Sequence, residues 1–517
     1  MGDLILAIDN GTQSVRALLF DARGELIACS RIELDDYACA RPGWHEHDAQ
    51  GFWLRVCDAC SQLWSCEPGA RERVAAVVVT TQRGTVVPVD RNGEPLRPAI
   101  TWLDQRKSAT YPAISPLLRA AFAAAGAAET VRYFQREAES NWLAAHEPDI
   151  WKRTAKFLLL SGFLNFRLTG RYADSVGAQV GYVPFDFKRL RWAARNDWKW
   201  RALGIAPEQL PELEPPGATI GTVTAQASEA TGIAAGTPVI AGAADKACEV
   251  LGAGCFEPSI AALSYGTTAT INVASERYLE ASPLVPPYPS AIPGAYDLEV
   301  QIFRGYWMVS WFKEQFGYLE REAAGRSGVT PESLFDQLVV SVPPGAMGLL
   351  LQPYWSPGLK MPEAKGAILG FGDVHTRAHL YRAILEGLAY ALREGKERIE
   401  RRTRVAVAQL RVCGGGSQSD AAMQLTADIF GLPAARPHVY ETSGLGAAID
   451  AAVGLHLYPD VASAVRAMTR TGRVFEPQPQ AQALYDALYR RVYVKIYERL
   501  RPLYEAIREI TGYPPPA

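Results

Sequence analysis

The sequence predicts an α/β protein built from two related domains. Near the N-terminus, two short apolar runs at 4–8 and 15–21 flank a turn containing Asn-Gly, which is typical of a β-hairpin. The continuous apolar run 74–79 is typical of a strand buried on both faces of a sheet. In the second half, the run 260–265 ends in a Gly-Thr turn, as the first run does. This repetition indicates two similarly built domains that face one cleft.

Apolar spacing places the remaining elements. The predicted helices are 51–64, 378–398, 421–430 and 481–500, and the further predicted strands are 26–29, 238–242 and 410–413. The strand 26–29 extends the first hairpin into a meander. Four tyrosines in the last helix, from Tyr485 to Tyr497, recur every four residues and are interpreted as packing residues. The Pro- and Gly-rich stretch 211–221 is interpreted as a connector, and the domain boundary is expected within 245–254.

Composition excludes several classes of protein. The 517 residues carry 53 Lys and Arg against 55 Asp and Glu, a net charge of −2, which argues against nucleic-acid binding. No apolar run approaches the ~18 residues that a membrane span needs. The N-terminus, beginning Met1-Gly2-Asp3, lacks the positive charge of a secretory signal, so a cytoplasmic location is expected. The eight cysteines are scattered, and Cys57 and Cys60 on a predicted helix are interpreted as structural thiols.

The turn after the first strand has the residue types of a phosphate site. Gly11 and the Thr12 hydroxyl let N–H and O–H groups approach phosphate oxygens closely. Asp9 is placed to hold a hydrated Mg²⁺, and Arg16 adds a charged donor. Taken alone, a capped hairpin turn without a ligand explains these residues equally well. A second such turn, Gly266-Thr267-Thr268, lies at the matching place in the second half, and the pair favours phosphate binding.

Three consecutive glycines lie between the predicted strand 410–413 and the predicted helix 421–430. Because Gly414-Gly415-Gly416 carry no Cβ, a planar base or a ribose is able to lie against this backbone. Ser417 is predicted to cap the following helix. The alternative is a tight strand-to-helix turn, which seldom needs three glycines, so nucleotide binding is favoured.

Two further segments suit a polyhydroxylated ligand. Trp102, Asp104 and Arg106 combine an aromatic wall, a carboxylate acceptor and a cationic donor, although an ordinary surface ion pair explains them as well. Gln82-Arg83 adds donors after the buried strand 74–79. Asp245 follows the strand 238–242 among small residues, which leaves room for a substrate hydroxyl and a general-base role. An Asp at a strand end is also a common turn former.

The order of these motifs along nearly the whole chain resembles the FGGY family of carbohydrate kinases, which includes xylulokinases, ribulokinases and glycerol kinases. The motifs that carry the resemblance are Asp9-Asn10-Gly11-Thr12 with Ser14 and Arg16, Pro42-Gly43-Trp44-His45-Glu46, Leu168-Thr169-Gly170 with Asp174, Gly242-Ala243-Ala244-Asp245, Ser264-Tyr265-Gly266-Thr267-Thr268, 366–371 followed by His379-Leu380 and Glu386, Gly414-Gly415-Gly416-Ser417 with Ala427-Asp428, and 444–448.

The resemblance implies two ribonuclease-H-like α/β domains of the actin and hexokinase type facing a central cleft. An N-terminal FGGY domain is expected at 1–248, with the sugar and first phosphate motifs, and an ATP-binding C-terminal FGGY domain at 249–517. The expected reaction is transfer of the γ-phosphoryl group of ATP, with Mg²⁺, to a terminal hydroxyl of a small ketose or polyol. The expected site residues are Asp245 for catalysis; Gln82, Arg83, Trp102, Asp104, Arg106 and Asp245 for the sugar; Gly11, Thr12, Gln13, Arg16, Gly266, Thr267, Thr268, Gly414, Gly415, Gly416 and Ser417 for ATP; and Asp9 and Asp245 for Mg²⁺.

Departures from the family pattern bear on the sugar. Gln82-Arg83-Gly84 stands where xylulokinases carry Gln-Met-His-Gly, and Arg83 matches the glycerol kinases instead. Trp102-x-Asp104-x-Arg106, in contrast, resembles the ketopentose kinases. D-xylulose is the favoured substrate, with ribulose, a tetritol or glycerol as alternatives and a homodimer as the candidate assembly. Hypotheses of another class are a non-catalytic sugar- or nucleotide-responsive regulator and a chaperone-like ATPase on the same fold.

Overall fold

The computed structural model describes residues 2–35, 39, 41–281, 285–355 and 361–513; Met1, from which the N-terminal charge was judged, lies outside them. The chain forms two compact units. Unit 1 comprises 1–256, 275–297 and 441–470, and unit 2 comprises 257–274, 298–440 and 471–517. Each unit is therefore assembled from segments that are distant in sequence.

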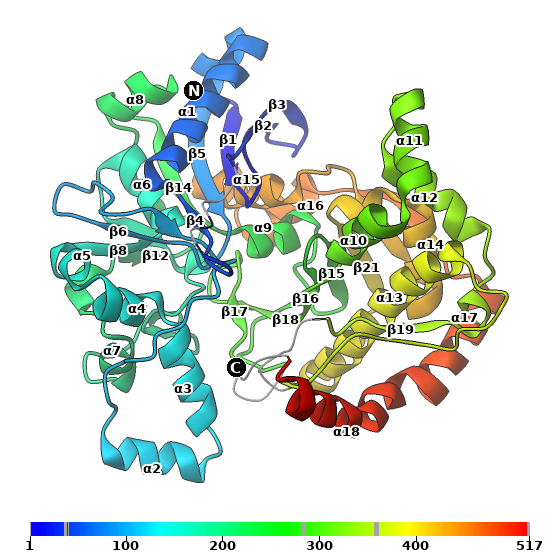
Figure 1. Cartoon of the computed structure of the whole chain (residues 1–517). Coiled ribbons are helices and arrows are strands. Elements are labelled where there is room, and N and C mark those ends of the chain that lie inside the picture. Colours follow the sequence, from blue (N-terminus) through cyan, green and yellow to red (C-terminus); the bar gives the residue numbers. More distant parts are fainter. Residues whose placement is uncertain (1, 36–38, 40, 282–284, 356–360, 514–517) are drawn as a thin grey trace. The chain divides into compact units, whose positions relative to one another are not determined.

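A six-stranded sheet forms the centre of unit 1 (Figure 1). Its strands, in spatial order, are β13 (Thr219–Thr222), β14 (Pro238–Ala244), β5 (Val74–Thr81), β1 (Leu4–Asn10), β2 (Ser14–Asp21) and β3 (Leu26–Glu33). The meander β1-β2-β3 is antiparallel, whereas β1, β5 and β14 run parallel. The predicted hairpin, third strand and buried central strand are confirmed. The strand at 238–242, assigned from sequence to the second copy of the pattern, belongs to this first sheet.

Helices cover both faces of this sheet. Helices α1 (Ala49–Cys66) and α6 (Leu160–Thr169) pack on the face that alternate β1 residues, such as Leu6, present to the core. Helices α9 (Asp245–Gly252) and α15 (Thr442–Gly454) cover the other face (Figure 1). These two helices approach each other closely because a Cβ at Gly446 would collide with the backbone of Cys248. Packing therefore accounts for a glycine that the resemblance places in the adenosine region.

A smaller four-stranded sheet in unit 1 supports the segment that contains Trp102. Its strands, in spatial order, are β4 (Glu46–His47), β7 (Ala99–Ile100), β6 (Val86–Val89) and β8 (Lys156–Leu159). Helix α3 (Ala128–Glu137) and helix α4 (Glu139–His146) lie beside it in sequence and contribute to an aromatic core around Trp142 and Phe185. The stretch interpreted as a connector, 211–221, contains β12 (Glu212–Glu214) and enters β13, because both short segments pair with existing strands.

Unit 2 repeats the strand pattern of unit 1. The central strands of its sheet, in spatial order, are β16 (Ala269–Ser275), β15 (Ile260–Tyr265), β21 (Gln409–Cys413), β22 (Ala434–Pro437) and β23 (Thr471–Phe475). The hairpin β15-β16 is antiparallel, and β15, β21 and β22 run parallel, as β1, β5 and β14 do in unit 1. The expectation of two similarly built α/β halves is confirmed.

The predicted helices of unit 2 are α13 (Arg377–Thr403) and α14 (Asp420–Phe430), but the expected helix 481–500 is interrupted. Helix α17 (Pro479–Leu488) passes through a π-helical turn at Tyr489–Tyr493 into α18 (Val494–Thr511). The turn brings Tyr489 and Tyr493 against Tyr390, with ring centroids 6.0 and 4.9 Å away. Tyr485, Tyr489 and Tyr493 are buried, which confirms their interpretation as packing residues.

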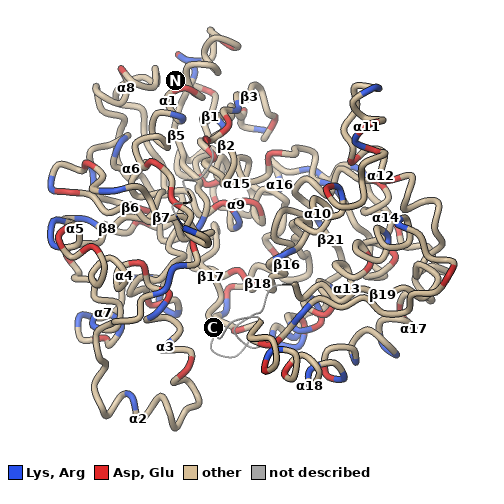
Figure 2. The backbone as a smooth tube through the Cα atoms, in the orientation of Figure 1, with Lys and Arg blue, Asp and Glu red and all other residues tan. Residues whose placement is uncertain are grey.

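Charge and thiols have the expected distribution. In each unit, basic and acidic residues alternate along the chain without a long stretch of one sign (Figure 2). No helix in the described ranges is both long and apolar enough to cross a membrane. Cys60 is buried in α1, and burial raises the pKa of the neighbouring Cys57 thiol to about 11, as is typical of unreactive structural thiols.

Candidate functional site

Three predicted site residues meet at one edge of the unit 1 sheet. Strands β1, β5 and β14 are parallel neighbours, with Asn10 and Ala244 both opposite Thr81. Gln82 and Asp245 directly follow the ends of their strands, and Asp9 is the last but one residue of β1. The carboxyl ends of parallel strands are where open α/β sheets bind ligands. The structure thus brings an amide and two carboxylates together there.

Asp9 is a buried carboxylate held by an arginine. Arg16 donates from one guanidinium nitrogen to Asp9 Oδ2 at 2.8 Å, and its Nε lies 3.5 Å from an Oε of Glu441. Burial raises the pKa of Asp9, which outweighs the opposing effect of Arg16. Glu441, which directly precedes α15, was not predicted as a site residue, because it lies more than 400 positions from Arg16 in sequence.

Asp245 is the first residue of α9 and is partly exposed. Its Oδ1 accepts the Lys246 amide at 2.7 Å, and the Lys246 ammonium pairs with Glu249 at 3.0 Å. Burial raises the pKa of Asp245 to about 6, against the lowering effects of Lys246 and Arg83. A carboxylate with this pKa is a stronger base than an ordinary Asp and is still ionised at neutral pH.

Gln82 has an unfilled hydrogen-bonding group. Its Oε1 accepts the Thr12 hydroxyl at 3.4 Å, whereas its buried Nε2 has no partner among the described residues. The Asn10 amide, fully buried at the end of β1, likewise has no partner within the described ranges. Buried polar groups are nearly always satisfied in native proteins. These amides therefore indicate that water or a ligand completes this edge of the sheet.

The two Gly-Thr turns have room beside their glycines. Gly11 and Gln13 lie in the turn between β1 and β2, where the Gly11 amide donates to Ser14 O at 3.0 Å. In unit 2, the carbonyls of Gly266 and Thr267 accept the amides of the segment that begins α10 (Trp307–Phe316) and the residue before it. A Cβ at Gly11 or Gly266 would meet its nearest atom at 3.6 or 3.5 Å, an ordinary contact. Thr268 Oγ1 lies 3.4 Å from Phe303 O.

The three glycines after β21 serve different purposes. Gly414 has φ +81°, and a Cβ there would lie 2.9 Å from the Tyr265 backbone. A Cβ at Gly416 would collide with the Tyr306 ring. Packing therefore explains these two glycines. At Gly415 the nearest atom to a Cβ is the Tyr440 hydroxyl at 3.8 Å, so the chain itself imposes no glycine there.

The prediction that Ser417 caps the following helix is wrong. Ser417 lies in a short 3₁₀ turn, and its hydroxyl donates to Gly414 O at 2.7 Å. Ser419 is the N-cap of α14, and its Oγ accepts the Ala422 amide at 2.9 Å. The 3₁₀ turn adds two residues between the glycines and the helix, which the residue types alone do not reveal.

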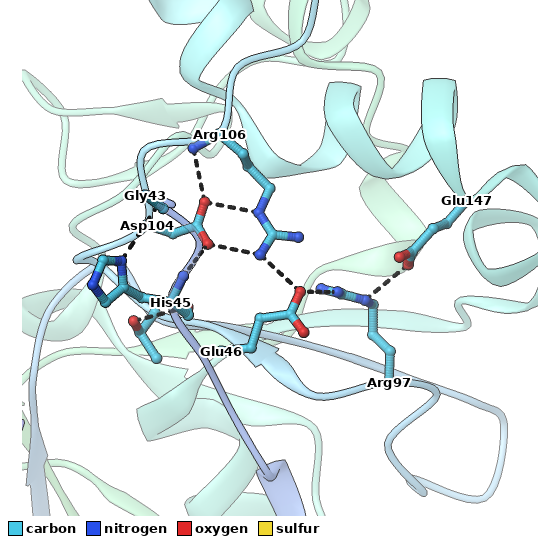
Figure 3. A network of polar contacts seen from close by, with 8 residues as sticks. Gly43, His45, Glu46, Arg97, Asp104, Arg106 and Glu147 are labelled. Carbon is cyan, nitrogen blue, oxygen red and sulfur yellow. Dashed lines mark hydrogen bonds and ion pairs between the residues drawn. The ribbon is translucent and has the colours of Figure 1, made fainter. Parts of the chain in front are cut away.

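Asp104 and Arg106 are engaged with one another. The Arg106 guanidinium donates to both carboxylate oxygens of Asp104 at 2.7 Å, and the His45 amide adds a third bond at 2.7 Å (Figure 3). Arg106 also pairs with Glu46 at 2.7 Å and lies over Trp44, 4.1 Å from the ring centroid. Both side chains are about 97% buried, with exposures of 3% and 2%. Their assignment to the sugar remains a prediction.

A polar cluster in unit 1 escaped the sequence analysis. Arg83 lies 4.7 Å above the Tyr288 ring, and Lys107 pairs with Glu137 at 3.1 Å. Burial raises the pKa of Glu139, the first residue of α4, to about 8. The residues come from four separate segments, so no periodicity or spacing signal groups them.

The comparisons with known proteins agree with this geometry. Models of the N-terminal and C-terminal domains of the FGGY family of carbohydrate kinases match residues 4–252 and 261–455. The chain belongs to the FGGY family of carbohydrate kinases. It is therefore an enzyme of the carbohydrate kinase class, for which a sugar or polyol and ATP are the substrates.

Relatives of this FGGY kinase match over nearly its whole length. An uncharacterized sugar kinase, YgcE, from Escherichia coli is 29% identical over 95% of this chain and 92% of its own. A xylulose kinase from Lactococcus lactis is 27% identical over 96% of each chain. The crystal structure of a xylulose kinase from Rhodospirillum rubrum superposes with a TM-score of 0.81 at 27% identity, covering 97% of this chain and all of that one. The two-domain fold of the family is thereby established for this chain.

Proposed function

We propose that this FGGY kinase transfers the γ-phosphoryl group of ATP to a terminal hydroxyl of a small ketose or polyol, with D-xylulose as the favoured acceptor. The observation that carries the proposal is the meeting of Asp245 and Gln82 at one sheet edge, where the Gln82 amide has an unfilled donor. An acceptor hydroxyl that accepts from Gln82 and donates to Asp245 satisfies both groups.

The reaction needs alignment more than covalent chemistry. A bond forms between the acceptor oxygen and the γ-phosphorus, and the bond from that phosphorus to the bridging oxygen of ADP breaks. The proton of the hydroxyl passes to Asp245. Because the transition state is loose, the acceptor loses its proton late, and we expect removal of the carboxylate to lower kcat by roughly 10²–10⁴-fold.

The proposed ATP residues present backbone and hydroxyl groups without bulk. In unit 1 they are Gly11, Thr12, Gln13 and Arg16, and in unit 2 they are Gly266, Thr267, Thr268 and the segment Gly414–Ser417. The free space beside Gly11, Gly266 and Gly415 supports these assignments, because the fold itself does not require glycine there. Backbone amides exposed in this manner bind phosphate oxygens closely.

Asp9 and Asp245 fit a magnesium ion of the kind that accompanies ATP. No group of three or more His, Cys, Asp or Glu side chains suited to a metal occurs in the described ranges. Mg²⁺ needs no such cage, since it is usually held by one or two carboxylates, water and phosphates. When bound, it neutralises phosphate charge. We expect Mg²⁺ to raise the Tm of the ADP complex, and Asp9→Asn to remove most of that increase.

Two features support a ketopentose over the alternatives. The segment Trp102–Arg106 resembles that of ketopentose kinases, and a relative covering 96% of the chain is named a xylulose kinase. Arg83, which matches the glycerol kinases, keeps glycerol, tetritols and ribulose as alternative acceptors.

The deciding experiment is ADP release from Mg²⁺-ATP by the purified protein. It is run with D-xylulose, ribulose, glycerol and tetritols, for the native chain and for Asp245→Asn. We expect stimulation by xylulose that is lost in the variant. As a matched control, Asp186→Asn changes an exposed Asp of unit 1 that bonds Arg189 and should retain activity.

Each other outcome has a distinct meaning. Stimulation by a different acceptor alone would replace D-xylulose as the substrate. ATP hydrolysis that no acceptor stimulates would support the ATPase, and nucleotide binding with neither hydrolysis nor stimulation would support the regulator; either result would contradict the proposal.

A further inference from the structure

Trp102 and Thr12 are joined by a hydrogen bond between two segments that the proposed function assigns to different substrates. The indole Nε1 of Trp102 donates to Thr12 Oγ1 at 3.0 Å. The Thr12 hydroxyl lies in turn 3.4 Å from Gln82 Oε1 and donates to it. All three residues belong to unit 1, and 90 residues separate Trp102 from Thr12. A sugar-facing aromatic residue thus contacts a phosphate-facing hydroxyl directly.

The position of Trp102 is imposed by the buried network below it. The Asp104 amide donates to Thr101 O at 3.0 Å, the Thr101 amide donates to His45 O at 3.1 Å, and the Asp104–Arg106 pair closes the turn (Figure 3). The Trp102 side chain itself is not packed away, because the residue is 38% exposed. Its backbone is therefore fixed while its ring remains available to a ligand.

The chemistry of the two groups sets a direction. An indole N–H only donates, so it occupies a lone pair of the Thr12 oxygen and leaves the single hydroxyl proton for another acceptor. The contact from Thr12 to Gln82 is long for an O–H···O hydrogen bond, which is usually 2.7–2.8 Å. A phosphate oxygen is charged and is the stronger acceptor.

We propose that Trp102 is a positioning residue for ATP: its indole N–H holds the Thr12 hydroxyl as a donor to the terminal phosphate, while its ring lines the sugar site. The inference rests on the proposed function, because it needs Thr12 at the phosphates. It also gives the Asp104–Arg106–Glu46 network a role: these residues act through Trp102 and do not contact the sugar.

The test is a double-mutant cycle of Trp102→Phe and Thr12→Val. Trp102→Phe keeps an aromatic wall and removes the N–H donor, and Thr12→Val keeps the shape and removes the hydroxyl. We measure affinity for Mg²⁺ with a non-hydrolysable ATP analogue by calorimetry, and KM for ATP and for the sugar. Trp102→Phe should weaken analogue binding roughly three- to tenfold, the range expected for one hydrogen bond, with less than a twofold change in sugar KM. In the Thr12→Val background it should have no further effect, whereas Thr12→Ser should retain the native affinity.

Trp64→Phe is the matched control, since it removes an indole bond of 2.8 Å to Thr231 O elsewhere in unit 1. Additive effects of the two changes, or a rise in sugar KM with unchanged analogue affinity, would overturn the inference. Because the calorimetry needs no turnover, it decides the inference even where ADP release shows no stimulation by a sugar. In that case the proposed function fails separately.

Discussion

Arg16 binds Asp9 at 2.8 Å and lies 3.5 Å from Glu441, so one arginine stands between two carboxylates. The three residues come from β1, β2 and the residue preceding α15, and Asp9 has a side-chain exposure of only 5%. Arg16 thereby neutralises a buried carboxylate that would otherwise stand beside a second one.

We expect Arg16→Gln to lower the free energy of unfolding by about 3 kcal/mol, because it leaves Asp9 buried without its charged partner. Arg31→Gln is the matched control. Arg31 lies opposite Arg16 on β3 and pairs with Glu33 at 3.0 Å, but both of its side-chain partners are exposed. Its loss should cost less than about 1 kcal/mol. Urea unfolding of the three proteins measures the difference, and equal losses would contradict the structural reading of Arg16.

The pH dependence of catalysis should report Asp245. Its pKa is raised to about 6 by burial, and a base acts only when it has lost its proton. We therefore expect kcat/KM to be constant above pH 7 and to fall about tenfold per pH unit well below pH 6. Initial rates of ADP release from pH 5 to 8 test this. A profile that is flat down to pH 5 would argue against Asp245 as the base.

Two neighbouring glycines should respond differently to alanine. Gly414→Ala places a Cβ 2.9 Å from the Tyr265 backbone at a positive φ, and we expect a loss of about 1–3 kcal/mol in stability. Gly415→Ala has space for its Cβ and should preserve the Tm. If nucleotide lies against Gly415, the same change raises KM for ATP. Thermal unfolding and ATP titrations separate the two effects, and an unchanged KM in Gly415→Ala would remove this residue from the nucleotide site.

Glu139 should make the protein more stable at low pH. Burial raises its pKa from 4.5 to about 8, so the folded chain binds a proton that the unfolded chain has released between these values. The stabilisation by that proton is present below pH 4.5 and is lost as pH rises through 8. Glu139→Gln should therefore raise the free energy of unfolding at pH 8 by on the order of 1–3 kcal/mol, and leave it nearly unchanged at pH 5.

The control for Glu139 is Glu137→Gln, which breaks the pair with Lys107 and should lower stability at both pH values. Urea unfolding at pH 5 and pH 8 gives the four differences. A destabilised Glu139→Gln at pH 8 would mean that this carboxylate is ionised and paired in the folded protein.

Tyr485 anchors α17 to the core of unit 2. Its hydroxyl donates to Glu386 Oε1 at 2.7 Å and accepts from Arg382 at 2.6 Å, and all three side chains are buried. Tyr485→Phe should lower the free energy of unfolding by about 1–3 kcal/mol, because a buried charged pair loses a partner. Tyr497→Phe, which removes a less buried bond to Glu363, should cost less. Chemical unfolding tests the order, and the reverse order would contradict it.

The sequence by itself determined the local elements and the family. Alternating and helical apolar patterns identified the meander β1-β2-β3, the buried strand β5 and helices α1, α13 and α14, because burial of one face depends only on residues near in sequence. The ordered motifs identified the FGGY family, and the strand ends already placed Asp9, Gln82 and Asp245 after strands.

Only the tertiary structure decided what surrounds those residues. It joined Asp104 to Arg106 and Glu46, moved the cap of α14 from Ser417 to Ser419, and showed that packing accounts for Gly414 and Gly416. Hydrogen-bond partners, ion pairs and space for a Cβ depend on segments that approach from distant parts of the chain. Sequence spacing carries no record of those approaches, whereas the periodicity of a strand or helix is written entirely in its own residues.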